Sequence, residues 1–308
     1  MPSLPFTPPL VQLHDCLVGA NPIIWSNDDF NDLAGDVPLD TILREMRTAG
    51  FSGSELGHAY PRTPGPLADA LGRHDLRLVS GWHSTYLVSR ELAEEERSFR
   101  AHSNLLKALG ARVVIVAECT RCIHGDRDTA LGFGDKLAPR LSEAEWPRLL
   151  AGLKHLAALA VAEDMQVVYH HHMGTVIQNE TDLHRLLAGV PELRLLLDAG
   201  HLAFAGIDPV AVARRYAARI AHVHLKSVRP EVAERVRREG WSFYRAVVNG
   251  VFTVAGDGCV DYPAIFALLA GADYRGWLVV EAEEDPVKVP ALPKATRARD
   301  YVRQQTGV

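Results

Sequence analysis

A regular alternation of short apolar runs and helical patterns along almost the whole chain is the feature that most limits its fold. Eight runs have the length and composition of β-strands, at residues 16–20, 51–56, 76–82, 112–118, 166–172, 193–201, 220–227 and 276–283. Between them, apolar residues recur at the i, i+3, i+4, i+7 spacing of a helix, as at Leu39, Ile42, Leu43 and Met46. Strands that alternate with helices in this way indicate a parallel sheet with crossover helices.

The spacing of the strand ends favours a closed barrel over a doubly wound sheet. From Asp198 to His224, for example, is 26 residues, the length of one strand and helix unit. No G-x-G-x-x-G turn follows the first run, and no P-loop sequence occurs. We therefore predict an α/β fold, a single (β/α)8 TIM barrel spanning residues 1–308 with an insertion after the seventh strand. Loop insertions are expected at about 120–141 and 228–260, at the end of the barrel that carries function.

Composition and charge exclude several classes of protein. The net charge of −5 disfavours a nucleic-acid partner. No apolar run is long enough to span a membrane, and the first residues do not resemble a signal peptide, so a cytoplasmic protein without a membrane partner is predicted. Four cysteines are too few for a disulfide scaffold. Cys119 and Cys122 form a C-x-x-C pair, but no second pair exists, and we interpret them as incidental cysteines near a strand end.

Ionisable residues stand at the C-terminal ends of most of the predicted strands. They are Glu55, His83, Glu118, His170, His172, Asp198, His201, His224, Lys226, Glu281 and Glu283. In a barrel these ends converge at one mouth. Because side chains alternate along a strand, His170 and His172 are expected to share a face and His171 to point the other way. Asp198 alone would equally suit a helix N-cap. The whole set, which mixes imidazoles and carboxylates, predicts a site for Mn²⁺, Co²⁺ or Zn²⁺.

Several longer motifs resemble those of the inosose dehydratases (2-keto-myo-inositol dehydratases), a family of the xylose-isomerase-like TIM-barrel superfamily. These motifs are "YHHHMGT", "LLLDAGH", "HVHLKSVR", "GVFTVAGDGCVDY" and "GWLVVEAEEDP", together with "WSNDD" at 25–29. The resemblance covers nearly the whole chain. It implies that water is removed from 2-keto-myo-inositol in inositol catabolism, with Co²⁺ or Mn²⁺ as cofactor; Zn²⁺ and Mg²⁺ are the alternatives.

The resemblance also implies a set of metal ligands. The superfamily typically uses Glu, Asp, His and Glu from four consecutive strands, and the last three match Asp198, His224 and Glu281. The first Glu has no counterpart, because His170 occupies its place in "YHHH". We assign His170 as the first ligand, and His172 or Glu118 remain alternatives.

Dehydration beside a ketone requires removal of an α-proton, stabilisation of the enolate and protonation of the departing hydroxyl. The candidates for proton transfer and polarisation are Glu118, His201, Glu283 and Lys226. The candidates for contact with the polyol are Glu55, His83, His172 and Arg229. Which residue is the acid and which the base stays open. The insertion at 228–260 is expected to close over the mouth or to contact a neighbouring subunit in a homo-oligomer.

Three other functions are compatible with such a barrel. An epimerase or isomerase of the same superfamily would act on a keto sugar or keto inositol. An endonuclease-IV-like DNA repair enzyme would need more metal ligands and a basic face, which an acidic chain does not offer. A sugar-binding barrel without activity would not need the metal-ligand residue types.

Overall fold

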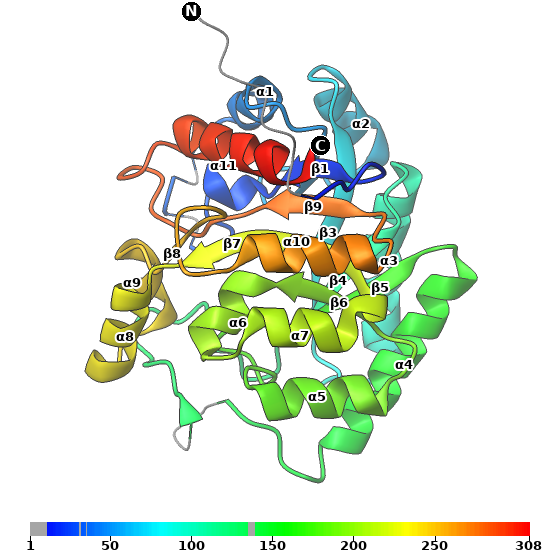
Figure 1. Cartoon of the computed structure of the whole chain (residues 1–308). Helices are drawn as coiled ribbons and strands as arrows, with labels where there is room; N and C mark the ends of the chain where they lie inside the picture. Colours follow the sequence, from blue (N-terminus) through cyan, green and yellow to red (C-terminus); the bar gives the residue numbers. More distant parts are fainter. Residues whose placement is uncertain (1–10, 31, 35, 135–138) are drawn as a thin grey trace, which may run out of the picture.

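The computed structural model describes residues 11–30, 32–34, 36–134 and 139–308, which form a closed barrel (Figure 1). Its wall consists of eight parallel strands, β1 (Leu17–Ala20), β2 (Gly53–Leu56), β3 (Arg77–Thr85), β4 (Val113–Glu118), β5 (Gln166–His170), β6 (Arg194–Asp198), β7 (Ile220–Val228) and β9 (Trp277–Val280). Each strand pairs with the next, and β9 pairs with both β7 and β1, which closes the ring. The predicted (β/α)8 barrel is therefore confirmed, and every predicted run overlaps one strand of the wall.

Most helices cover the outside of the wall (Figure 1). The helices are α1 (Leu39–Thr48), α2 (Pro64–Gly72), α3 (Leu92–Ala108), α4 (Trp146–Ala162), α5 (Glu180–Gly189), α6 (Ala199–Ala205), α7 (Pro209–Tyr216), α8 (Pro230–Glu239), α9 (Phe243–Val248), α10 (Tyr262–Gly271) and α11 (Ala291–Thr306), with short 3-10 turns at Pro22–Ile24 and Ala217–Arg219. Of these, α8 and α9 lie beyond the C-terminal end of the wall strands (Figure 1). The helical spacing at the start of the chain corresponds to α1, where Ile42, Leu43 and Met46 are fully buried. Apolar helix faces packed on the strands form the main core.

A small apolar cluster fills the inside of the barrel and supports the functional end. It consists of Val113, Ile115, Val168 and Leu196, with Trp82 packed against it. Because side chains alternate along a strand, Val168 shares its face with His170, and Leu196 shares its face with Asp198. The apolar cluster therefore lies inside the barrel, directly below the polar residues at the strand ends.

The insertion after β7 contains α8, α9 and a short strand, β8 (Phe252–Val254). Strand β8 pairs antiparallel with the end of β7, which places Val254 opposite Lys226. A second apolar core, which includes Phe204, Trp241 and Phe243, holds the insertion against the barrel. Figure 1 shows these elements beyond the tips of the β7 and β9 arrows, at the C-terminal end of the wall.

The N-terminal end of the predicted domain lies outside the described structure. Residues 1–10 lie outside the described residues, so the boundary of a single domain at 1–308 stays a prediction. Residues 135–138 of the predicted insertion at 120–141 also lie outside them. Among the described residues, no helix has the length and apolar character needed to cross a membrane.

Candidate active site

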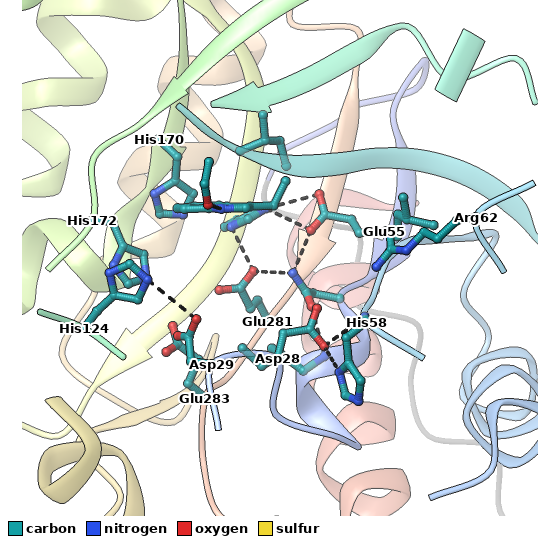
Figure 2. Close-up of a pocket in the computed structure, with 17 residues that line it drawn as sticks. Asp28, Asp29, Glu55, His58, Arg62, His124, His170, His172, Glu281 and Glu283 are labelled. Carbon is teal, nitrogen blue, oxygen red and sulfur yellow. Dashed lines mark hydrogen bonds and ion pairs between the residues drawn. The ribbon is translucent and has the colours of Figure 1, made fainter. Parts of the chain in front are cut away.

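A cavity of about 290 Å³ opens at the C-terminal end of the barrel (Figure 2). Its polar lining consists of Asn21, Asp28, Asp29, Glu55, His58, Arg62, Ser84, His124, His170, His172, His224, Glu281 and Glu283. Asp198, His201 and Lys226 contact these lining residues from within the barrel. The structure thus brings most of the predicted site residues to one place.

Donor atoms suited to a metal ion converge around Asp198. Its Oδ2 lies 3.4 Å from Nε2 of His170 and 3.4 Å from Nδ1 of His224. Nδ1 of His224 lies 2.9 Å from Oε2 of Glu281. Within the described part of the chain, neither Asp198 Oδ2 nor His224 Nδ1 makes a hydrogen bond of good geometry, although both atoms are buried. Because a buried polar atom without a hydrogen bond is unfavourable, this donor set fits a divalent cation.

The two oxygens of Asp198 have different partners. Oδ1 accepts a hydrogen bond of 2.8 Å from the backbone N–H of His201 and caps the N-terminus of α6, as the N-cap interpretation predicts. Oδ2 is left for the site. Burial alone would raise the pKa of Asp198, but Lys226 and the neighbouring histidines outweigh burial and hold that pKa well below its usual value. The carboxylate therefore stays charged, as a metal ligand must.

Lys226 is a fully buried ammonium group among three carboxylates. Its Nζ lies 2.6 Å from Oε1 of Glu283 and 3.2 Å from Oδ2 of Asp198, and it also contacts Oε1 of Glu281. Burial disfavours the charge, but these three carboxylates raise the pKa of Lys226 well above its usual value. Burial also raises the pKa of Glu283, to about 8, against the opposing effect of Lys226. A carboxyl group that titrates near neutral pH can accept and release a proton.

Glu55 contacts His224 on the side of the ring that faces away from Asp198. Its carboxylate lies 3.2 Å from Nε2 of His224 and 2.7 Å from Nε2 of His222, and it accepts a hydrogen bond of 2.6 Å from Oγ of Ser80. A carboxylate that binds the second nitrogen of a metal-ligating histidine fixes the orientation of the ring. Glu55, which was predicted to contact the polyol, lines the cavity and also orients His224.

The three consecutive histidines have the alternating orientation that the sequence predicts. His170 and His172 line the cavity (Figure 2). His171 points elsewhere, and its Nε2 pairs with the backbone oxygen of Gln178. Nδ1 of His170 pairs with the backbone oxygen of His171 at 2.7 Å, which leaves Nε2 of His170 directed at Asp198. The ring of His172 packs on the ring of His201, with centroids 3.9 Å apart.

Glu118 and His83 lie outside the cavity, which contradicts their predicted catalytic and substrate-binding roles. The carboxylate of Glu118 accepts hydrogen bonds from Oγ1 of Thr85 at 3.0 Å and from the backbone N–H of Leu87 at 2.9 Å. The ring of His83 packs against Phe99 of α3. Strand alternation is the reason: the neighbours of these residues on β3 and β4 face the inside of the barrel, so His83 and Glu118 face the helix layer.

Arg229 was also predicted from the sequence to contact the substrate, and the structure places it elsewhere. Its Nη1 donates hydrogen bonds to the backbone oxygens of Gly250 at 2.7 Å and Phe252 at 2.8 Å, and pairs with Glu284 at 2.9 Å. These contacts fasten the insertion to the segment that follows β9. Arg229 therefore has a structural role and does not line the cavity.

The burial of His83 predicts that acid lowers the free energy of unfolding more in wild type than in a variant without this histidine. Burial, followed by the charges of His102 and Arg90, lowers the pKa of His83 to about 4. The unfolded chain binds this proton below about pH 6.5. The stabilising contribution of neutral His83 is therefore complete above pH 6.5 and is lost as the pH falls toward 4. Urea unfolding should show wild type losing about 2 kcal/mol more than His83→Phe between pH 7 and pH 5. Parallel curves for the two proteins would contradict this assignment.

Seven polar cavity residues were given no role from the sequence, namely Asn21, Asp28, Asp29, His58, Arg62, Ser84 and His124. Asn21 donates hydrogen bonds to Oε2 of Glu55 at 2.8 Å and to Oε2 of Glu281 at 2.9 Å. Nδ1 of His58 pairs with Oδ1 of Asp28 at 2.6 Å. Nε2 of His124 lies 3.8 Å from Oδ1 of Asp29. All but Ser84, which belongs to β3, lie outside regular strands and helices. Only Asp28 and Asp29 had a signal, the "WSNDD" motif.

Comparison with known proteins agrees with this fold and site. A family profile described as xylose isomerase-like TIM barrel matches residues 43–305. The inosose dehydratase of Geobacillus thermodenitrificans is 43% identical over 293 residues, which cover 94% of this chain and 97% of that protein. The inosose dehydratase of Clostridium beijerinckii is 40% identical over 292 residues, again covering 94% of this chain and 97% of that protein.

Solved structures share the architecture at low sequence identity. The D-allulose 3-epimerase of Methylomonas sp., in complex with D-allulose, has a TM-score of 0.65 and 18% identity, and the match covers 94% of this chain and 97% of that one. A probable 3-DHS dehydratase of Bacillus anthracis has a TM-score of 0.65 and 14% identity, with 93% and 98% covered. At such identities the structures support the fold alone. By full-length similarity to curated relatives, the chain belongs to the inosose dehydratase family of xylose isomerase-like TIM barrels.

Proposed function

We propose that this protein is a cytoplasmic, metal-dependent hydro-lyase that removes water from 2-keto-myo-inositol in inositol catabolism. The relatives named inosose dehydratase support the substrate and the reaction. The observation that carries the proposal is the convergence of Asp198, His224 and Glu281 beside the buried pair of Lys226 and Glu283. This arrangement offers a cation site and a proton-transfer group in one cavity of small-molecule size.

The metal would be held by Asp198, His224 and Glu281, with His170 as the fourth ligand. When bound, Mn²⁺ or Co²⁺, or in their place Zn²⁺ or Mg²⁺, supplies Lewis-acid stabilisation of negative charge on the ketone oxygen. Glu55 keeps the His224 ring in position through its contact with Nε2 of that ring. Asn21 links Glu55 to Glu281 and so joins two sides of the site.

Glu283 is the group best placed to remove the α-proton. Its Oε1 is held by Lys226 at 2.6 Å and by Nε2 of His201 at 3.2 Å, whereas Oε2 has no hydrogen-bond partner among the described residues. When Oε2 takes the proton, the electrons of the C–H bond form the enol double bond. As the carbonyl forms again, the double bond moves to the next pair of carbon atoms and the C–O bond there breaks, while the same carboxyl gives its proton to the departing hydroxyl, which leaves as water. The remaining enol tautomerises to a diketone.

The outer part of the cavity would bind the remaining hydroxyl groups of a polyol. Asp28, Asp29 and His58 supply acceptors and donors around the opening, and Arg62 adds a further donor (Figure 2). The side chain of His172 faces the same space. Several such groups, placed above the apolar cluster, favour a ring that carries hydroxyls in many directions.

Incubation with 2-keto-myo-inositol tests the proposal directly. Protein stripped of metal and then supplied with Mn²⁺ or Co²⁺ should produce the ultraviolet absorbance of an enolised diketone, and mass spectrometry should detect a product lighter by one water. Protein without added metal serves as the control. An isomer of unchanged mass would identify an epimerase or isomerase instead. No product with either ion, in protein shown to be folded by circular dichroism, would contradict the assignment.

A further inference from the structure

The C-x-x-C pair that follows β4 forms a tight turn. The backbone N–H of Cys122 donates to the backbone oxygen of Cys119 at 3.0 Å, and Arg121 between them has a φ of +58°. Such a turn keeps its end Cα atoms within about 7 Å of each other. A disulfide requires Cα atoms about 4.4 to 6.8 Å apart. The backbone therefore already holds the two cysteines at a separation suited to a disulfide.

The two thiols differ in environment. Cys119 is buried and Cys122 is only half-buried, so a small reagent reaches Cys122 first. The neighbouring Cys119 thiol and then His124 lower the pKa of Cys122, against the opposing effect of burial. The hydrogen bond with Cys122 and then burial raise the pKa of Cys119. An accessible thiolate beside a protonated thiol is the usual arrangement of an attacking and a resolving cysteine.

His124 connects this pair to the cavity. Its ring lines the cavity and lies 4.9 Å from the ring of His172 (Figure 2). Burial disfavours a charged ring, but Cys122 and Asp29 offset burial and raise the pKa of His124 to about 9. The backbone just before His124 is held as well, because the N–H of Ile123 donates to the oxygen of Gly174 at 2.8 Å.

The turn that carries the cysteines and the segment that follows His172 approach each other closely at Gly174. Gly174 has a φ of +77°, and a Cβ atom at this position would lie 2.9 Å from the backbone nitrogen of His124. The turn that carries the cysteines is therefore packed directly against the segment that follows His172. A change at Cys122 has little room to relax without moving His124.

We infer that Cys119 and Cys122 form a dithiol site for hydroperoxides, whose oxidation to a disulfide lowers the activity of the adjacent cavity through His124. The effect on activity rests on the proposed dehydratase function, whereas the dithiol chemistry does not. The sequence alone indicated two incidental cysteines. The turn, the difference in exposure and the position of His124, two residues after Cys122 and in the cavity lining, are what change that interpretation.

The reaction consumes one peroxide for each disulfide. The Cys122 thiolate attacks one peroxide oxygen, the O–O bond breaks, and the departing hydroxide or alkoxide takes a proton, which leaves Cys122 as a sulfenic acid. The sulfur of Cys119 then attacks the sulfur of Cys122, the S–O bond breaks, and the hydroxide leaves with the Cys119 proton as water. Two thiols are oxidised by two electrons, and the peroxide is reduced. A dithiol reductant reverses the change.

Disulfide formation removes the thiolate form of Cys122, which favours a charged ring at His124. The ring then loses the partner that offsets its burial, and a neutral ring leaves Asp29 without its cationic neighbour. Both groups line the cavity. Activity is expected to fall about tenfold, which is within the usual range for coupling between two sites.

Tryptic mapping tests the dithiol without any assay of activity. Trypsin cuts after Arg121, so the cysteines fall in separate peptides, 113–121 and 122–127. After treatment of the full-length protein with hydrogen peroxide, these two peptides should be linked and should separate with dithiothreitol. In Cys119→Ser, dimedone should instead label Cys122. The matched control is Cys259→Ser, which removes an exposed single cysteine and should behave as wild type. Peptides that remain unlinked in wild type would overturn the inference.

Two further readouts test the coupling to the cavity. Peroxide should lower dehydratase activity about tenfold in wild type and in Cys259→Ser, with recovery in dithiothreitol, whereas Cys122→Ser should keep its own initial activity. The ring signal of His124 in carbon NMR, assigned with His124→Gln, should change from charged to neutral at pH 7.5 when the peptides become linked. This signal tests the coupling even if no dehydratase activity is found. A linked pair with an unchanged His124 signal would refute the coupling.

Discussion

Asp198→Asn is expected to lose its bound metal and to turn over substrate about 10³-fold more slowly, because Lewis-acid stabilisation worth several kcal/mol disappears with the ion. Asparagine retains an oxygen in the place of Oδ1, which accepts the His201 N–H and caps α6. It removes the charge at Oδ2, the atom that faces His170 and His224. The fold should therefore survive while the site does not. Asp198→Ala should abolish both metal content and turnover, and should also lose about 1 kcal/mol of helix capping.

The control for this prediction is Asp208→Asn. Asp208 caps α7 by accepting the N–H of Val210 at 2.9 Å, so the change has the same chemistry at a helix that starts away from the cavity. This variant should keep its full metal content and turnover. Elemental analysis of the purified proteins, followed by the diketone assay, measures both quantities. Full metal occupancy in Asp198→Asn would show that Asp198 is not a ligand.

The barrel could be predicted from the sequence because each of its units leaves a local signal. A buried parallel strand gives a short apolar run and a covering helix gives a 3.6-residue period, so both α1 and the wall strands could be recognised. The end of each strand then predicted where ionisable groups would gather. That step was correct for Asp198, His224 and Glu281, which the structure brings into contact.

Two strand-end residues were wrongly assigned to the cavity because their side chains point away from it. Their positions along the chain, at the ends of strands, were predicted correctly. His83 and Glu118 stand at the correct ends of β3 and β4 but point toward the helices. Side chains alternate along a strand, and this rule correctly separated His171 from its neighbours. Once Trp82 and Ile115 are known to face inward, the same rule excludes His83 and Glu118 from the cavity. Sequence alone did not supply that reference point, because apolar residues stand on both faces of these strands, as Val79 and Trp82 do on β3.

The cavity residues that lie on loops could not be placed for a different reason. Asn21 bridges Glu55 and Glu281, which are 34 and 260 residues away in sequence. Asp29 lies near His124, which is 95 residues away in sequence. No period or spacing relates such residues, since their proximity is a product of the closed ring. Loop residues of this kind can therefore be assigned to the site only once the fold is known.

Replacing Lys226 with methionine is the second change with a large expected effect. Methionine keeps the length and volume of the side chain but removes the ammonium that lies among Asp198, Glu281 and Glu283. Three buried carboxylates are then left close together without their shared cation. Removing one partner of a buried ion pair typically costs about 3 to 5 kcal/mol of unfolding free energy. Turnover should fall about 10²- to 10⁴-fold, because Glu283 loses the contact that positions it for proton transfer.

Lys294→Met separates these two effects. Lys294 is buried to a similar degree and pairs with Glu284 at 2.9 Å, but it lies in α11 and does not line the cavity. Its loss should also lower the free energy of unfolding, to a smaller extent because Arg229 still pairs with Glu284. Its turnover per folded molecule should stay at the wild-type level. Urea unfolding and the diketone assay, applied to both variants, therefore distinguish a lysine that stabilises the barrel from one that also serves the reaction. Wild-type turnover in folded Lys226→Met would mean that Glu283 needs no ammonium neighbour, and the proposed route of the α-proton would fail.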